Sequence, residues 1–224
     1  MAFPPLGIAV TQTSPTFRHD LLELGLASEN RKRAPLGSVF GTSLSRATVL
    51  PSGWRSSVAV ALSHYARAMF RVFVLLGLVL VAGLGTGLTS LAGLALAGFF
   101  LACSILVHEL GHVAAYRLLG GSMAPGIAVA KGMRCHLVRR GLPPWRDLLV
   151  AAAGPLAPGF LVPFLVPFLW VAPLTCGAWL AIALGHALCA LWPVGDGVTI
   201  WGAVAQLSRR RRAARSDASP RSLL

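Results

Sequence analysis

The segment His108-Glu109-Leu110-Gly111-His112 holds the residues of this sequence that are best suited to chemistry. On a helix, positions four residues apart share a face, so the two imidazoles can bind one Zn2+ ion. Glu109 lies one step round the helix, where its carboxylate can bind the water on that metal. The spacing therefore predicts a zinc centre with one ion per chain, held in part by His108 and His112.

The structural alternative is a pair of core histidines that are satisfied by hydrogen bonds. That alternative leaves the Glu109 carboxylate without a counter-charge inside an apolar segment. An ionisable group in a membrane span costs at least about 2.5 kcal/mol on insertion scales and usually marks a functional site. A bound cation offsets this cost because it neutralises the carboxylate, so the sequence favours the metal centre.

A second carboxylate, Asp196, lies in a later apolar segment. Of the seven Asp and Glu residues, only Glu109 and Asp196 fall inside predicted spans. His108 and Asp196 each precede the predicted cytosolic end of their span by about eleven residues, which places both about 16 Å deep at the rise of an α-helix. We therefore predict Asp196 as the third metal ligand, with a fourth position open for water. His186, nearer the other end of the same span, is the alternative ligand.

The composition is that of a membrane protein. Hydrophobic residues make up 55% of the chain and charged residues 12%, whereas soluble domains carry about a quarter charged residues. Apolar runs predict an all-α polytopic membrane protein with four transmembrane helices, at about 72–84, 88–119, 148–173 and 177–207. The third run must be kinked or broken because it holds several prolines, namely Pro155, Pro158, Pro163, Pro167 and Pro173.

Basic residues set the predicted orientation. The net charge of +13 does not indicate nucleic-acid binding, which needs a basic face carrying aromatic residues on a soluble domain. All 20 Lys and Arg lie in three blocks, at 18–71, 117–146 and 209–221. The positive-inside rule then places both termini and the 120–147 loop in the cytoplasm.

Three regions are expected along the chain. Residues 1–57 are rich in Pro, Gly and Ser without a helical or strand period, which predicts a mobile cytosolic tail. Residues 58–207 are predicted as the membrane-embedded core, opening on a basic amphipathic lead-in at 58–71, and residues 208–224 as a basic cytosolic tail. Three of the four cysteines lie in apolar runs and predict packing, while Cys135-His136 remains a minor candidate for a metal pair.

The sequence resembles the site-2 protease family of intramembrane zinc metalloproteases over about residues 69–207. The resemblance rests on His108 to His112, on Ala153-Gly154-Pro155-Leu156-Ala157, and on Leu191-Trp192-Pro193-Val194-Gly195-Asp196-Gly197. It implies His108, His112 and Asp196 as zinc ligands and Glu109 as general base of an endopeptidase. It also implies a small membrane-associated strand region between the second and third helices, which could pair with an extended substrate.

Two residues depart from the family pattern. The family usually has Asn at the positions of Pro158 and Ala190, and the second Asn is thought to help hold substrate. An inactive zinc-binding homologue that acts as a membrane interaction protein is therefore the alternative function. The partners expected for an active enzyme are single-span membrane proteins within the lipid bilayer, and the sequence leaves homo-oligomers open. The Arg- and Ala-rich composition fits a bacterial cell membrane protein.

Overall fold

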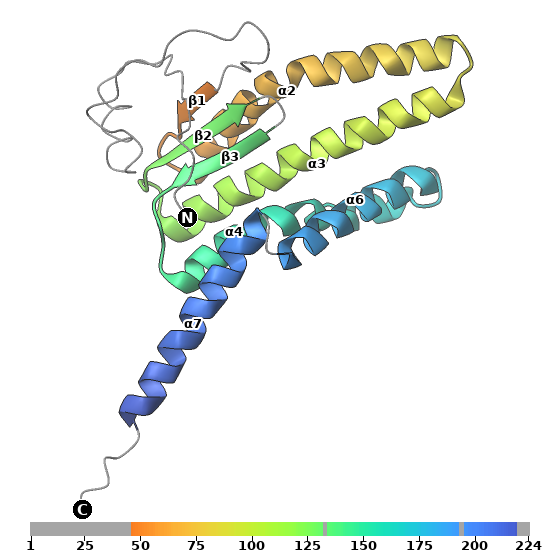
Figure 1. The fold of residues 1–224 in the computed structure, drawn as a ribbon. Coiled ribbons are helices and arrows are strands. Elements are labelled where there is room, and N and C mark those ends of the chain that lie inside the picture. The colour runs from red at the N-terminus through yellow and green to blue at the C-terminus, as the bar shows by residue number, and fades with distance from the viewer. Residues whose placement is uncertain (1–45, 132–133, 193–194, 219–224) are drawn as a thin grey trace, which may run out of the picture. The chain divides into compact units, whose positions relative to one another are not determined.

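The computed structural model describes residues 46–131, 134–192 and 195–218, and most of them are helical (Figure 1). The chain divides into two compact units, the first ending at Arg140 and the second beginning at Gly141. Four helices are long and apolar enough to cross a membrane: Trp54–Gly85, Thr89–Gly120, Pro144–Phe168 and Pro173–Leu191. The chain is therefore an integral membrane protein, and the prediction of an all-α polytopic fold with about four spans and a small strand region is confirmed.

Helices α2 (Trp54–Gly85) and α3 (Thr89–Gly120) form an antiparallel pair in the first unit. The predicted lead-in at 58–71 and the predicted first span at 72–84 are one continuous helix, because no proline or glycine interrupts residues 54–76. Gly87, with φ of 73°, supplies the left-handed residue of the turn between the two helices. The second span agrees closely with its predicted bounds of 88–119.

Gly83 is expected to be essential for this helix pair. A Cβ atom at position 83 would lie 2.7 Å from the backbone nitrogen of Ala92, whereas one at Gly77 would meet nothing within 4 Å. Gly83→Ala should therefore destabilise the protein by about 1–3 kcal/mol through overpacking. Gly77→Ala, the matched control, should be neutral or stabilising by up to about 1 kcal/mol through helix propensity. Thermal unfolding of both variants in detergent measures the difference, and equal midpoints would contradict the close contact.

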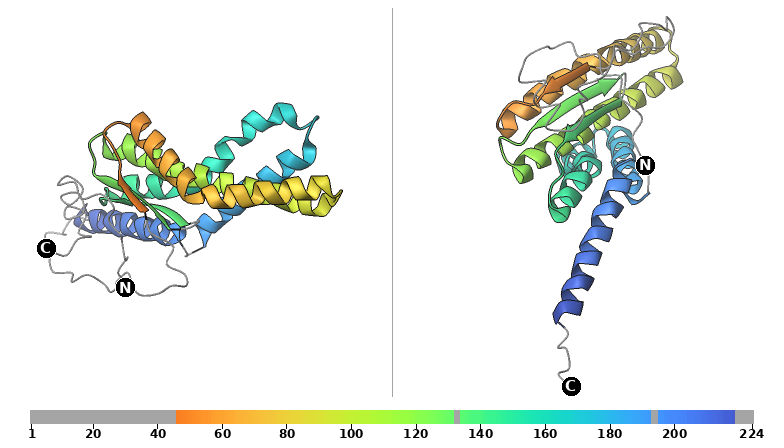
Figure 2. Two further views of the ribbon diagram at one scale, coloured as in Figure 1. Left: turned by 90° about the horizontal axis from the view of Figure 1, so that it is seen from above. Right: turned by 60° about the vertical axis from the view of Figure 1, so that its left-hand side comes forward.

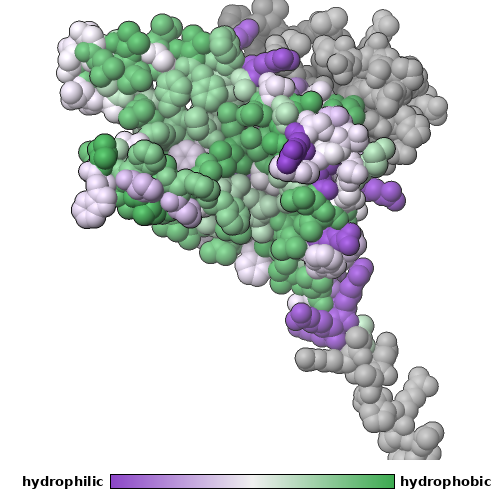
Figure 3. Space-filling view, turned by 180° about the vertical axis from the view of Figure 1, so that it is seen from behind, coloured by the Kyte–Doolittle hydropathy of each residue, from purple (hydrophilic) through white to green (hydrophobic). Residues whose placement is uncertain are grey.

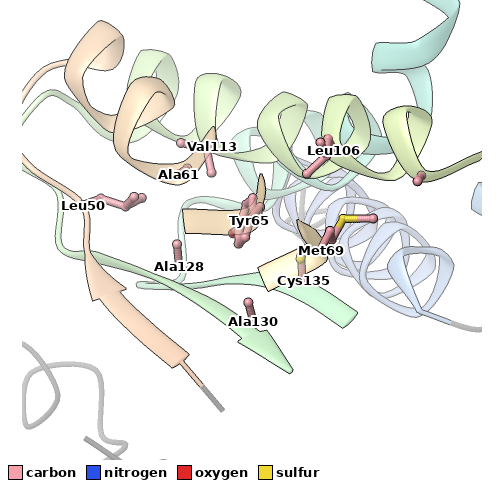
Figure 4. Packing of buried hydrophobic residues seen from close by; sticks show 10 residues of the cluster. Leu50, Ala61, Tyr65, Met69, Leu106, Val113, Ala128, Ala130 and Cys135 are labelled. Atoms are coloured by element: carbon pink, nitrogen blue, oxygen red, sulfur yellow. The ribbon is translucent and has the colours of Figure 1, made fainter. Parts of the chain in front are cut away.

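A three-stranded antiparallel sheet lies beside this helix pair, in the order β1 (Arg46–Val49), β2 (Gly126–Lys131) and β3 (Arg134–Arg139). Figures 1 and 2 show it against α2 and α3. Ala128, Ala130 and Cys135 face the helices and pack around Tyr65 and Met69 (Figure 4). The strand region expected at 120–147 is present, but β1 was not predicted, since it falls within the 1–57 segment.

Arg117 joins the end of α3 to the other parts of the first unit. Its guanidinium is buried and donates hydrogen bonds to Leu50 O at 2.8 Å, Ser57 Oγ at 2.6 Å and Ser122 O at 3.2 Å, and also to Ala124 O. A buried cation is stable only where its donors find acceptors. These four hydrogen bonds connect α3 to the start of α2, to the residue after β1 and to the segment before β2.

The proline-rich third span opens the second unit and is broken, as predicted, although two of its prolines lie inside a helix. Helix α4 (Pro144–Phe160) includes Pro155 and Pro158 and ends before the short helices α5 (Val162–Leu165) and η1 (Val166–Phe168). Both short helices carry a proline in their first turn, where the missing N–H has no intrahelical partner to lose. Trp179 Nε1 donates to Pro158 O at 3.1 Å, which satisfies one of the last carbonyls of α4.

The fourth predicted span, 177–207, is not one helix. Helix α6 (Pro173–Leu191) ends at Leu191, and the next helix, α7 (Asp196–Ala218), begins at Asp196. Trp192 is extended, with φ −87° and ψ 140°, as is usual for a residue that precedes proline, and Gly195 is left-handed with φ of 58°. The prediction of a continuous span was therefore wrong, and α7 also runs past its expected end at Leu207.

The helix surfaces match a lipid surrounding. Hydrophobic residues cover most of the face in Figure 3. Large apolar side chains are exposed on each candidate span, for example Leu78, Leu94, Phe164 and Leu180. Arg209 to Arg212 are exposed on α7, after the last candidate span. Exposed apolar area of this extent is expected of helices in contact with acyl chains.

Candidate metal centre

The two histidines of the motif lie on one face of α3, and their rings meet edge to face. The Nε2 atoms of His108 and His112 are 3.3 Å apart, with ring centroids at 4.9 Å and an interplanar angle of 80°. His112 is buried and His108 is half-buried. The helix thus brings the two nitrogens together as the four-residue spacing predicts.

This separation fits a shared metal ion. Two nitrogens bound to one tetrahedral zinc at 2.0–2.1 Å lie about 3.3 Å apart, which is the distance between these Nε2 atoms. The same distance also allows a hydrogen bond between the imidazoles, provided that one ring carries its proton on Nε2. The donor set is a usual one for zinc, since imidazole nitrogen and carboxylate oxygen are both common ligands.

Glu109 lies on the neighbouring face of α3, which turns toward the core of the first unit. Leu106 and Val113 share this face and belong to that core. The Glu109 side chain is 9% exposed and its Oε2 atom is buried. Its carboxylate acts electrostatically on the Tyr65 hydroxyl and the Cys135 thiol. The base predicted from the sequence is therefore held at the junction of α3, α2 and β3, away from bulk water.

One group of His, Cys, Asp and Glu side chains among the described residues could hold a metal ion, namely His108, His112 and Asp196. The two histidines belong to the first unit and Asp196 to the second. Asp196 is half-buried and is the first residue of α7. Metal binding by this group, the role of Asp196 as its third ligand and the identity of the ion remain predictions.

The minor candidates do not join this group. Burial raises the pKa of the Cys135 thiol to about 12, and the nearby Glu109 carboxylate adds to the rise. Burial also lowers the pKa of His136. Within the described parts of the chain, neither Cys135, His136 nor His186 belongs to a group of three metal-binding side chains.

Tyr65 is a residue near the site that the sequence analysis did not single out. It is fully buried on α2 and donates a hydrogen bond from its hydroxyl to the β3 carbonyl of His136 at 3.2 Å. The sequence offers only a general indication of its role, because a tyrosine hydroxyl in an apolar helix needs a hydrogen-bonding partner. Both tyrosines of the chain meet this need with carbonyls beside or within the sheet, since Tyr116 donates to Pro125 O at 2.6 Å.

Tyr65→Phe is expected to lower turnover several-fold while leaving the metal content unchanged. The change keeps the ring in the core but removes the hydroxyl that links α2 to β3 next to Glu109, at a stability cost of about 1 kcal/mol. Tyr116→Phe removes a hydroxyl of the same kind, two turns after Glu109 on α3, and is the matched control. Unfolding midpoints, bound zinc and turnover are measured for both variants. Equal turnover losses would show that Tyr65 contributes only to stability.

Comparison with known protein families, curated proteins and solved structures gives no match to this chain.

Proposed function

We propose that this chain is an intramembrane zinc-dependent endopeptidase that cleaves transmembrane segments of other proteins, as its resemblance to site-2 proteases implies. The observation that carries the proposal is the 3.3 Å separation of the His108 and His112 Nε2 atoms on a helix apolar enough to cross a membrane. A buried carboxylate, Glu109, occupies the adjacent position. Metal-assisted hydrolysis uses this combination of ligands and base.

Each residue has a defined role in the proposed reaction. His108, His112 and Asp196 would hold the ion, and zinc, when bound, would lower the pKa of a water molecule toward about 7. Glu109 takes the proton of that water as it attacks the peptide carbonyl, and then delivers it to the leaving amine. The burial of Glu109 supports this role because it limits proton exchange with bulk water.

The substrate class follows from the location of the motif in an apolar helix. A transmembrane helix hides its carbonyls in hydrogen bonds between residues four apart, so a substrate must unwind locally before attack. Single-span proteins with Gly or Pro near the cleavage point are the substrates that unwind most readily. Strand β3 lies at an edge of the sheet and could pair with the unwound segment.

The proposed orientation follows the basic blocks. The positive-inside rule places both termini and the sheet on the cytoplasmic side, in a bacterial cell membrane. The connections at 86–88 and 169–172, which carry no charged residue, then face outside. Products released at the sheet side of the site would enter the cytoplasm.

The experiment that tests this function is cleavage of a purified single-span substrate by the purified protein in lipid nanodiscs. Cleavage within the span should stop after zinc is chelated and resume when zinc is added back. Cleavage that survives chelation would overturn the metal mechanism. A zinc-loaded wild-type protein that cuts none of a panel of spans would favour the alternative, an inactive homologue that acts as a membrane interaction protein.

A further inference from the structure

The exposed side of α2 changes from basic to apolar side chains after Arg71. Toward the turn with α3 it carries large apolar side chains, with Val74 42%, Leu75 61% and Leu78 64% exposed. Toward the start of the helix it carries Arg67 and Arg71, which are both exposed and lie four residues apart on one face. Helix α2 contains no Asp or Glu, so neither arginine has an acidic partner on its own helix.

Contacts between α2 and α3 place these arginines at about the level of Cys103 to His108. Gly83 adjoins Ala92, Leu76 adjoins Gly98, and the rings of Phe73 and Phe99 lie 5.7 Å apart. Extending this antiparallel register toward the start of α2 places Arg71 about level with Cys103, and Arg67 about level with His108, because both helices rise by about 1.5 Å per residue.

The length of α3 indicates where this level lies in the membrane. His108 lies about 28 Å along the helix from Thr89, and the hydrocarbon core of a bilayer is about 30 Å thick. If α3 enters the core near Thr89, the motif reaches the opposite boundary. The depth of about 16 Å expected from the sequence took the helix end as the membrane boundary, but α3 has 32 residues, and about 20 suffice to span.

We infer that Arg67 and Arg71 bind the head group of an anionic phospholipid at the sheet-side boundary of the bilayer. The side chains of a helix tilt toward its N-terminus, which here directs both guanidinium groups toward that boundary. Two guanidiniums on one face suit a phosphate. The apolar residues Val74, Leu75 and Leu78 continue the strip in the direction of the acyl chains, which favours a lipid over a free phosphate ion.

The test uses the full chain, purified in detergent with equal amounts of phosphatidylglycerol and phosphatidylcholine. Native mass spectrometry should show that the wild type retains phosphatidylglycerol in preference to phosphatidylcholine by on the order of tenfold. The double variant Arg67→Gln/Arg71→Gln should retain both lipids nearly equally. The matched control Arg209→Gln/Arg210→Gln removes two exposed arginines from α7 and should keep the preference. Glutamine is a good helix former, so all variants are expected to fold, and their unfolding midpoints verify this.

Three outcomes would overturn the inference. Equal retention of the two lipids by the wild type would remove the site. An equal loss of preference in the control variant would show that net charge alone attracts the lipid. Displacement of phosphatidylglycerol by inorganic phosphate at millimolar concentration would indicate a free-phosphate site. Lipid retention is measured without substrate, so this result does not depend on whether the chain cleaves proteins.

Discussion

Glu109→Gln is expected to retain about one zinc ion per chain while losing turnover by about two to four orders of magnitude. Glutamine keeps the shape and hydrogen-bonding capacity of glutamate but cannot accept the proton of the attacking water. General-base catalysis typically contributes about 10²–10⁴-fold to a rate, which sets the expected loss. The His108 and His112 Nε2 atoms are unchanged, so the ion keeps both imidazole ligands. Metal content by mass spectrometry and cleavage of a model span are measured on the same preparation.

His112→Asn provides the contrast to this variant. It removes one of the two nitrogens that lie 3.3 Å apart, so zinc and turnover should fall together. If Glu109→Gln lost its zinc as well, Glu109 would be a ligand and not a base. If it kept near-normal turnover, the proton would be taken by another group. An inactive homologue would be indicated by a wild type that binds zinc and shows no more cleavage than Glu109→Gln.

The part of the site that the sequence predicted best is the part that one helix determines. Positions 108 and 112 meet because an α-helix repeats every 3.6 residues, and no distant contact is needed to place them. The same reasoning gave α3 within about one residue at each end. The break in the third span was also local, since Pro163 and Pro167 each lie in the first turn of a new short helix. Pro155 and Pro158, in contrast, lie inside α4 without ending it.

The features that the sequence did not give depend on contacts far apart in the chain. Strand β1 forms because Arg46 to Val49 find hydrogen-bonding partners on β2, some 80 residues later. Tyr65 meets β3 through a hydrogen bond across 71 residues. The end of α6 is an exception, because its signal, a residue followed by proline at Trp192-Pro193, is local in the sequence but lies in a long apolar run. Hydropathy identifies a span by its average, so it does not register a single residue that ends the helix.

Asp196→Asn is expected to weaken zinc binding by more than about tenfold and to lower turnover in proportion. The change replaces an anionic oxygen donor with a neutral one, and even residues that only support metal ligands typically contribute 10–100-fold to affinity. Zinc bound per chain is measured at several free zinc concentrations, with turnover measured alongside. High zinc should then restore part of the lost activity, because the base, Glu109, is unchanged.

The asparagine substitution also separates a metal ligand from a structural role at the start of a helix. Asp196 opens α7, where a carboxylate is favourable with or without a metal. Asparagine lacks the negative charge, so if the role of Asp196 is structural, Asp196→Asn should destabilise the start of α7 by about 0.3–1 kcal/mol and leave the zinc content unchanged. His186→Asn, on α6, is the matched control and should keep both zinc and turnover. If the control lost zinc and Asp196→Asn did not, the third ligand would be His186, and the carboxylate at the start of α7 would serve only the helix.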